Sequence, residues 1–282
     1  MVEQPTQSAG SGSSPTPPLQ VSEISISDAA DFMVTRHYNA TMPRLNKAAY
    51  GGFIEERLVA AISFGWGSRP RHTIQRLFPS LDTRDYFEIG KMALDDSLPK
   101  NSGTKFLSVV LRLLRTKFPD LKLVFTWADG MYGKPGYVYQ AANFLYGGFI
   151  WTDTYLTKDG RRVHPLQLRS ETHQRNETTA LRTNRPSVQK QRELGWQHFS
   201  GKQFRYAYFL CPKKEQERLL KESTTSWSRD NYPKQADLDW KPDRRTTAPS
   251  IPQPKFLGVL NDYRERTQGS EDWLTELEQN VV

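Results

Sequence analysis

The sequence predicts one folded unit of the α/β (α+β) class, in which helices flank a mixed central sheet. Two apolar runs joined by a short charged segment indicate a β-hairpin, and an amphipathic helical pattern lies between two short apolar runs. Aromatic and polar residues then alternate near residue 200. Hairpins and a strand–helix–strand unit in one chain of 282 residues are typical of a mixed sheet.

The composition indicates a single core with polar extensions. Hydrophobic residues make up 37% of the chain, and residues 1–20 are rich in Ser, Gly, Pro and Gln. Such a leader buries too little apolar surface to offset its ordering entropy, so we expect disorder there. We place the folded domain at residues 21–212, with a polar insertion or linker at about 170–195. A charged helix and a mostly flexible tail are expected at 213–282.

The first elements are a strand, a helix and a hairpin. Residues 21–26 alternate and predict a strand, and Ser27 and Asp28 predict the N-cap of a helix that runs through Val34. Residues 50–54 and 58–65 form the two arms of the predicted hairpin.

A strand–helix–strand unit follows the hairpin. A third strand is expected at residues 87–94, and apolar residues recur at helical spacing from Phe106 to Phe118, where Pro119 ends the helix. A short apolar strand follows at 121–127, so these two strands are expected to be parallel.

The last part of the domain predicts a short helix and two further strands. The helix covers 137–144 and closes near Gly147 and Gly148, and a strand continues through Tyr155. Residues 196–210 predict a final strand or hairpin, and a charged helix extends from Pro212 to about Lys221.

Charge and cysteine content limit the class of protein. The net charge of +8 favours a polyanionic partner, although cations in the last third could simply keep a tail solvated. Cys211 is the only cysteine, which excludes an internal disulfide and a thiolate zinc cluster. No apolar run approaches the roughly 20 residues of a membrane span, so we expect a soluble, cytoplasmic protein.

The loop before the central helix is a candidate anion site. Lys100, Asn101, Ser102 and Thr104 lie between a strand and a helix start, where backbone N–H groups and the positive helix end could hold a phosphate. The usual Gly-rich signature is missing, and Asn-Ser is also an ordinary N-cap sequence.

Two residues are candidates for proton transfer. Asp129 follows the end of a predicted strand, where polar groups commonly face a cleft, although an Asx turn is the alternative. His37 lies in a loop, and its ordinary pKa near neutrality suits a general base. His164 and His173 are too far from it in sequence to indicate a metal site, and we expect none.

Further candidates lie on the second helix and in basic segments. Tyr139 and Asn143 share one helical face beside Gln140; Tyr could donate a proton, and an amide could bind an adenine edge. A core position for Tyr139 is the alternative. Three clusters mix cations with aromatic or proline residues, namely Arg69–Arg71, Arg161–Arg162 and Lys202–Tyr206. The last is the strongest because it lies in a patterned strand.

Taken together, these segments resemble the Mom-type family of phage DNA-modification proteins, whose members are similar to GNAT acyltransferases in fold. The resemblance covers residues 21–212. The matching pieces, in order, are His37-Tyr38, residues 58–65, Glu88, residues 99–102, 127–130 and 136–144, His164 and residues 202–206. Two departures are Gly133–Gly136, where the family commonly has a His, and Glu88–Lys91, which is looser than the family's strand.

The resemblance implies attachment of a carbamoylmethyl (glycinamide-like) group to adenine N6 in duplex DNA, which protects phage DNA from host restriction. For this reaction we hypothesise Asp129 or His37 as proton acceptor and Tyr139 as a further catalytic or stacking residue. We expect Lys100, Asn101, Ser102 and Thr104 to bind the donor, for which an acyl-CoA or another activated glycine carrier such as a charged tRNA would each suit a basic GNAT-like cleft. The expected DNA contacts are Tyr38, Trp66, Gln140, Asn143, Lys202 and Arg205.

Two other functions remain open from the sequence. A GNAT-type N-acyltransferase acting on a protein or small-molecule amine would use the same donor loop, and a non-catalytic basic DNA-binding protein would use the cations alone. A homodimer is compatible with the sequence, which does not determine the oligomeric state.

Overall fold

The computed structural model describes residues 18–37, 43, 46–67, 70–160, 162–163, 188–242, 247 and 249–254. Most of the expected leader, and the insertion as far as residue 187, lie outside the described residues. No helix in this part of the chain is long and apolar enough to cross a membrane.

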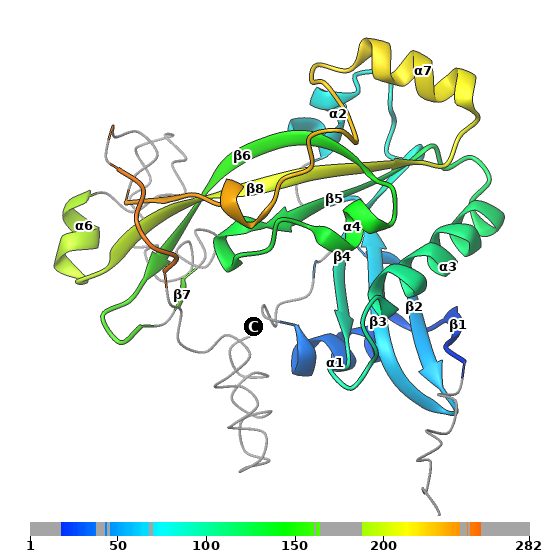
Figure 1. Cartoon of the computed structure of the whole chain (residues 1–282), viewed down its shortest axis with the longest axis horizontal. Helices are drawn as coiled ribbons and strands as arrows, with labels where there is room; N and C mark the ends of the chain where they lie inside the picture. Colours follow the sequence, from blue (N-terminus) through cyan, green and yellow to red (C-terminus); the bar gives the residue numbers. More distant parts are fainter. Residues whose placement is uncertain are drawn as a thin grey trace, which may run out of the picture.

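A sheet of nine strands forms the body of the protein (Figure 1). Its order is β1-β2-β3-β4-β5-β8-β6-β7, and β9 pairs with β8. The strands are β1 (Gln20–Glu23), β2 (Asn46–Ile54), β3 (Arg57–Gly65), β4 (Tyr86–Leu94), β5 (Leu123–Asp129), β6 (Leu145–Leu156), β7 (Arg162–Val163), β8 (Gln197–Phe209) and β9 (Trp240–Lys241). Among the described strands only β4 and β5 pair in parallel, so the predicted mixed sheet is confirmed.

Helices cover both faces of the sheet. The helical segments are α1 (Ile26–Arg36), η1 (Pro70–His72), α2 (Ile74–Leu77), α3 (Ser102–Lys117), η2 (Gly130–Tyr132), α4 (Tyr137–Ala141), α6 (Val188–Glu193), α7 (Lys213–Glu222) and η3 (Gln235–Asp237). On one face α3 packs on a large core that includes Val124, whereas Phe125, the next residue of β5, packs with α2 and α7 on the other face. Successive side chains of a strand point to opposite faces, so α1, which packs on Ala61, also lies on the second face.

The parallel pair is short. Only Tyr86–Glu88 of β4 pairs with Leu123–Phe125 of β5, although β4 continues to Leu94 and β5 to Asp129. All seven residues of β5 pair instead with β8 on its other side. The inner edges of β4 and β5 are therefore unpaired with each other beyond Glu88 and Phe125, and we call this part of the sheet the opening.

Strands β6 and β8 extend past the opening as a two-stranded arm. Strand β5 pairs with β8 only over Gln203–Phe209, whereas β6 pairs with β8 down to Gln197. The arm, residues 151–156 and 197–202, therefore projects from the body, as Figure 1 shows on its left-hand side.

The expected N-cap of the first helix was wrong. The side-chain oxygen of Ser25, rather than Ser27 or Asp28, caps α1 by accepting a hydrogen bond from the Asp28 N–H at 3.0 Å. Asp28 instead lies in the first turn, where its carboxylate favours the helix dipole.

The glycine pair does not close a helix. Gly147 and Gly148 lie inside β6, at a register shift between Tyr146 and Phe149, and α4 already ends at Ala141. A Cβ on Gly147 would lie 2.3 Å from the Trp227 ring, and Gly148 has φ of +79°. Tertiary contact, rather than local helix termination, therefore requires these glycines.

The segment after α7, which we expected to belong to a flexible tail, packs on the sheet as far as residue 242. Trp227 stacks on Phe78 at 5.3 Å, and the Trp240 Nε1–H donates to the Met131 carbonyl at 3.2 Å. Large aromatic side chains bury enough area to order such a segment.

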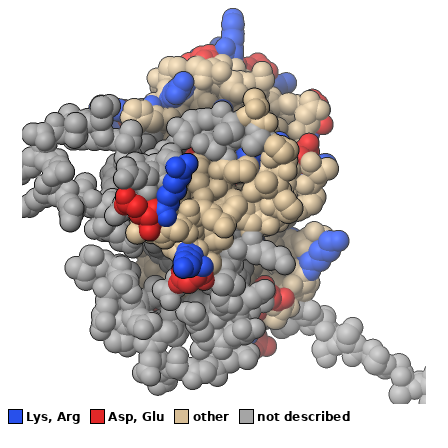
Figure 2. Space-filling model, turned by 90° about the vertical axis from the view of Figure 1, so that its left-hand side faces the viewer, with Lys and Arg blue, Asp and Glu red and all other residues tan. Residues whose placement is uncertain are grey.

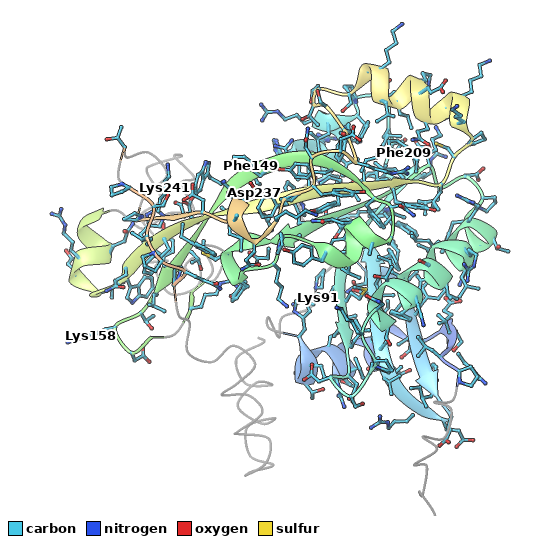
Figure 3. The ribbon with its side chains drawn as sticks, in the orientation of Figure 1. Lys91, Phe149, Lys158, Phe209, Asp237 and Lys241 are labelled. Atoms are coloured by element: carbon cyan, nitrogen blue, oxygen red, sulfur yellow. The ribbon has the colours of Figure 1, made fainter. Side chains whose placement is uncertain are left out.

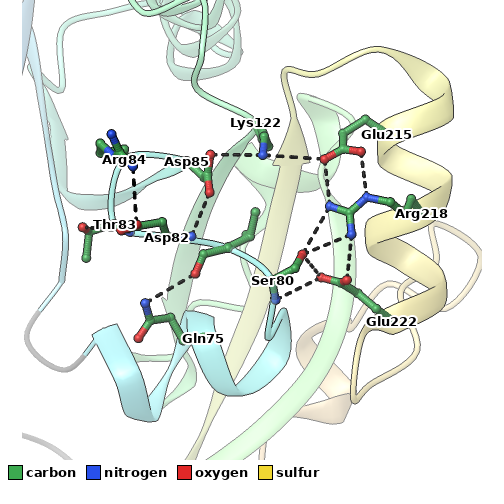
Figure 4. Close-up of polar contacts among 11 residues, drawn as sticks. Gln75, Ser80, Asp82, Thr83, Arg84, Asp85, Lys122, Glu215, Arg218 and Glu222 are labelled. Atoms are coloured by element: carbon green, nitrogen blue, oxygen red, sulfur yellow. Dashed lines mark hydrogen bonds and ion pairs between the residues drawn. The ribbon is translucent and has the colours of Figure 1, made fainter.

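Helix α7 is fastened to the body by a buried leucine and a polar network (Figure 4). Leu219 is fully buried. Arg218 donates to Glu215, Glu222 and Ser80, while the Lys122 ammonium lies 3.1 Å from Asp85 and 3.7 Å from Glu215. Exposed ion pairs contribute little to stability, so Leu219 dominates the attachment.

We expect Leu219→Ala to lower the free energy of unfolding by about 2–5 kcal/mol, because it leaves a cavity in the core. Arg218→Ala should lower it far less. Urea unfolding of both variants tests this order, and a larger loss for Arg218→Ala would contradict it.

Candidate active site

The opening between β4 and β5 brings together charged side chains from separate elements. Lys91 comes from β4, Asp129 from the end of β5, Arg162 from β7 and His37 from the residue after α1. The Lys91 Nζ lies 3.3 Å from His37 Nδ1, and Lys91 is only 7% exposed. Figure 3 shows Lys91 in the angle between the arm and α1. The two proton-transfer candidates, His37 and Asp129, thus both interact with the same lysine.

A tight turn fixes the position of Asp129. Its carboxylate caps η2 by accepting a hydrogen bond from the Met131 N–H at 3.1 Å. A Cβ on Gly130 would lie 2.4 Å from the Lys202 carbonyl oxygen, so only glycine allows β8 to approach here. The Asx turn that we considered as an alternative is therefore present, and it holds the carboxylate at the edge of the opening.

Burial and neighbouring charges oppose each other at Asp129. Burial raises the pKa of its carboxyl group, and Arg162, Lys134 and Lys91 act in the opposite direction. A carboxylate with a raised pKa is a stronger base than an ordinary aspartate, yet the cations keep it able to ionise.

Lys91 is the most perturbed cation of the site. Burial, followed by repulsion from Arg162, lowers the pKa of Lys91 to about 7, although Asp129 acts to raise it. Near neutral pH the amine therefore exchanges a proton readily. A base and an exchangeable ammonium in one opening can together move a proton.

Glu88 is the last residue of β4 that pairs with β5, and burial raises its pKa to about 7. A Cβ on Gly67, which has φ of +69°, would lie 2.3 Å from Glu88 Oε2. The sequence gave Glu88 and Lys91 no site role of their own, and it indicated Arg162 only as part of a candidate basic cluster. The signal for the first two was a pair of charged residues within the apolar strand Phe87–Leu94.

The predicted donor loop lies beside α4. A Cβ on Gly103 would contact Val138 of α4 at 3.4 Å, and one on Gly136 would contact Ala128 at 2.9 Å. Gly136 caps α4, and the Lys134 N–H donates to the Asp129 carbonyl at 3.2 Å. The start of α4 lies between residues 100–104 and the end of β5, and α3 covers one face of the sheet whereas the Asp129 side chain points to the other.

Two predicted site residues of α4 lie in the interior. Tyr139 packs 5.6 Å from the Tyr206 ring and 5.5 Å from Phe144, on the α3 face of the sheet rather than the face of Asp129. The alternative core position of Tyr139 is therefore the observed one. The Gln140 amide donates to Tyr206 Oη at 3.0 Å and to the Pro233 carbonyl at 2.8 Å, which gives it a structural role.

Asn143 is separated from the opening. It has φ of +62° after α4 and lines a pocket of about 420 Å³ with Arg115, Lys213 and Arg229.

The remaining DNA-contact candidates occupy different places. The Trp66 ring is covered by the Lys47 ammonium at 4.0 Å. Lys202 donates to the Asp237 carbonyl at 2.8 Å, and Arg205 donates to the Phe149 carbonyl at 3.1 Å. Tyr38, Arg69, Arg161, His164 and His173 lie outside the described residues. Within the described ranges no cluster of three His, Cys, Asp or Glu residues suits a metal ion.

The low pKa of Lys91 has a consequence for stability. Between about pH 7 and pH 10.5 the folded chain releases this proton while the unfolded chain keeps it, so stability rises with pH in this range. Lys91→Met should remove up to about 1.4 kcal/mol per pH unit of that rise. Urea unfolding at pH 7, 8 and 9 measures the slope, with Lys105→Met on the exposed side of α3 as control. Identical slopes for wild type and Lys91→Met would refute the assignment.

This chain is similar in sequence to one protein family and has some structural similarity to known transferases. Residues 18–234 match the model of the Mom protein family. The chain is 29% identical over 234 residues to the methylcarbamoylase Mom of Escherichia phage Mu, covering 83% of this chain and 90% of that protein. Solved structures with some similarity include the GNAT family N-acetyltransferase YhbS from Escherichia coli in complex with CoA (9% identity, 80% of this chain and 96% of that chain, TM-score 0.40). Another is an aminoglycoside 6'-acetyltransferase type Ii (10% identity, 69% of this chain and 99% of that chain, TM-score 0.38). Because the family match runs from before β1 to beyond α7, this protein belongs to the Mom protein family.

Proposed function

We propose that this protein is a DNA-modifying transferase that adds a small carbamoylmethyl (glycinamide-like) group to adenine N6 in phage DNA and so protects it from host restriction. Membership of the Mom family supports this proposal, as does the name methylcarbamoylase of the phage Mu relative. The structural observation that carries it is the opening, where the buried Lys91 and the half-buried Asp129 interact electrostatically.

The opening suits the difficult step of this reaction. An exocyclic aromatic amine is a poor nucleophile because its lone pair is delocalised into the ring, so a base must take a proton as the amine reacts. Asp129 takes that proton, and its raised pKa makes it a better acceptor than an exposed aspartate. Lys91 and His37, 3.3 Å apart, provide a path for the proton to leave the opening.

The donor would be held at the start of α3, beside α4. Asn101 adopts φ of +70° there, the first turn of α3 contains no acidic residue, and Lys100 is exposed. These features suit an anionic carrier such as an acyl-CoA or a charged tRNA. As adenine N6 bonds to the methylene carbon of the transferred group, the bond from that carbon to its leaving group on the carrier breaks, and the leaving group takes the electron pair. Lys100, Asn101, Ser102 and Thr104 would bind and orient the carrier.

The DNA partner would contact the base of the arm. Lys202 lies over the Phe149 ring at 4.9 Å on the α3 face of β8, whereas Arg205, three residues further along the strand, points to the opposite face, which is the face of Asp129. On the end of the molecule shown in Figure 2, Lys and Arg are scattered singly, and several lie beside carboxylates. Individual cations, rather than a broad basic patch, would therefore hold the duplex. The target base must leave the stack to reach Asp129.

Asp129→Asn should abolish adenine modification while leaving the fold intact, because the amide cannot accept the proton. Mass spectrometry of nucleosides in DNA from expressing cells measures the product, with Asp120→Asn at an exposed turn as control. Modified adenine at the wild-type level in the Asp129→Asn sample would refute the role. Only four normal bases in the wild-type sample would refute the proposed function itself.

Lys202→Ala and Arg205→Ala should each weaken DNA binding similarly for all sequences, because phosphate contacts carry no base information. The slope of log affinity against log salt concentration should fall by about 0.9 for each lost contact. Fluorescence anisotropy with a labelled duplex at several salt concentrations measures it. An unchanged slope in both variants would exclude these cations from the interface.

A further inference from the structure

One row of side chains crosses three strands beside the opening. Gln203 of β8 is paired with Asp129 of β5 on one side and with Ile150 of β6 on the other. Directly paired residues of antiparallel strands point to the same face of a sheet. Asp129, Gln203 and Ile150 therefore lie side by side on one face, with neighbouring strands about 4.8 Å apart.

The Gln203 side chain is half-buried, and within the part of the chain that the structure describes its amide has no hydrogen-bond partner. Gln140, which was expected to bind a base, uses its amide inside the fold. Of these two amides, Gln203 is therefore the one placed next to the carboxylate of the opening.

Apolar groups border this amide on two sides. Trp127, half-buried and two residues before Asp129, lies on the same face in the adjacent row. Ile150 is 37% exposed and is one of the few large apolar side chains on the surface among the described residues. A polar pair between an aromatic ring and an aliphatic side chain is the kind of surface that holds a planar heterocycle.

We propose that Gln203 recognises the adenine whose N6 is modified, an inference that rests on the proposed function. The Gln203 carbonyl oxygen accepts one N6–H, and its N–H donates to N7 of the adenine ring. Asp129, the next residue in the row, is then adjacent to the other N6–H. Trp127 packs on the base, and Ile150 closes the outer side.

The chemistry of the row favours adenine over guanine and thymine. On the edge that carries N7, guanine presents two acceptors, O6 and N7, and thymine presents the O4 acceptor beside its C5-methyl group, so neither base can donate a hydrogen bond to the Gln203 carbonyl oxygen. Asp129 can only accept hydrogen bonds and Arg205 can only donate them, whereas an amide offers both in one plane. Gln203 is thus a specificity-determining residue, separate from proton transfer at Asp129.

Two variants of similar volume test this role. Gln203→Glu removes the N–H donor, and Gln203→Met removes both hydrogen-bonding groups. Gln197→Glu, at the exposed end of the same strand, is the matched control. Modified adenine is measured by mass spectrometry of nucleosides from expressing cells, together with the melting temperature of each purified protein and its affinity for a labelled duplex.

We expect both Gln203 variants to lose about tenfold or more of the modified adenine, with melting temperature and duplex affinity unchanged and Gln197→Glu fully active. If Gln203→Met keeps adenine modification within twofold of wild type, the inference is overturned and the proposed function stands. A loss that follows a lower melting temperature assigns Gln203 a structural role and also overturns it. If the wild type yields no modified adenine, the proposed function fails, and this inference with it.

Discussion

The early end of the β4–β5 pairing is the constraint on which the rest of the structure depends. Parallel strands normally continue their hydrogen bonds along their shared length, and here the pairing stops at Glu88 and Phe125. The strands can part because each has a full partner on its outer side. Strand β3 pairs with β4, and β8 pairs with every residue of β5. The opening is thus supported by an otherwise continuous sheet.

Charged groups in that opening oppose folding. Burial shifts the pKa values of Glu88 and Lys91 toward neutrality from opposite directions, which means that the charged form of each is destabilised by the fold. The extensive cores on both faces of the sheet offset this cost. A protein that needed only stability would place apolar side chains at these positions, so their presence favours a chemical role.

The arm and the chain after α7 complete the surface beside the opening. Strand β8 carries Gln203 and Arg205 next to β5, and β6 adds Ile150 and the Phe149 carbonyl that Arg205 binds. Trp227 fills the space over Gly147, which allows β6 to bend toward β8 at its register shift. One side of the opening therefore depends on residues distant in sequence from Asp129.

The sequence by itself determined the elements that follow local periodicity: the hairpin of β2 and β3, the helix α3 and the strands on either side of it. It also predicted Asp129, His37 and the loop at 100–104 as site residues, because strand ends and helix starts are local features. It did not reveal the internal role of Gln140, the bulge at Gly147 and Gly148 or the packing of the segment after α7 on the sheet. Those features depend on contacts that only the fold creates: Gln140 with Tyr206, Gly147 with Trp227, and Met131 with Trp240. Strand pairing decided which residues lie beside Gln203 and where β4 and β5 separate. Both features arise from contacts between segments distant in sequence, which local patterns do not encode.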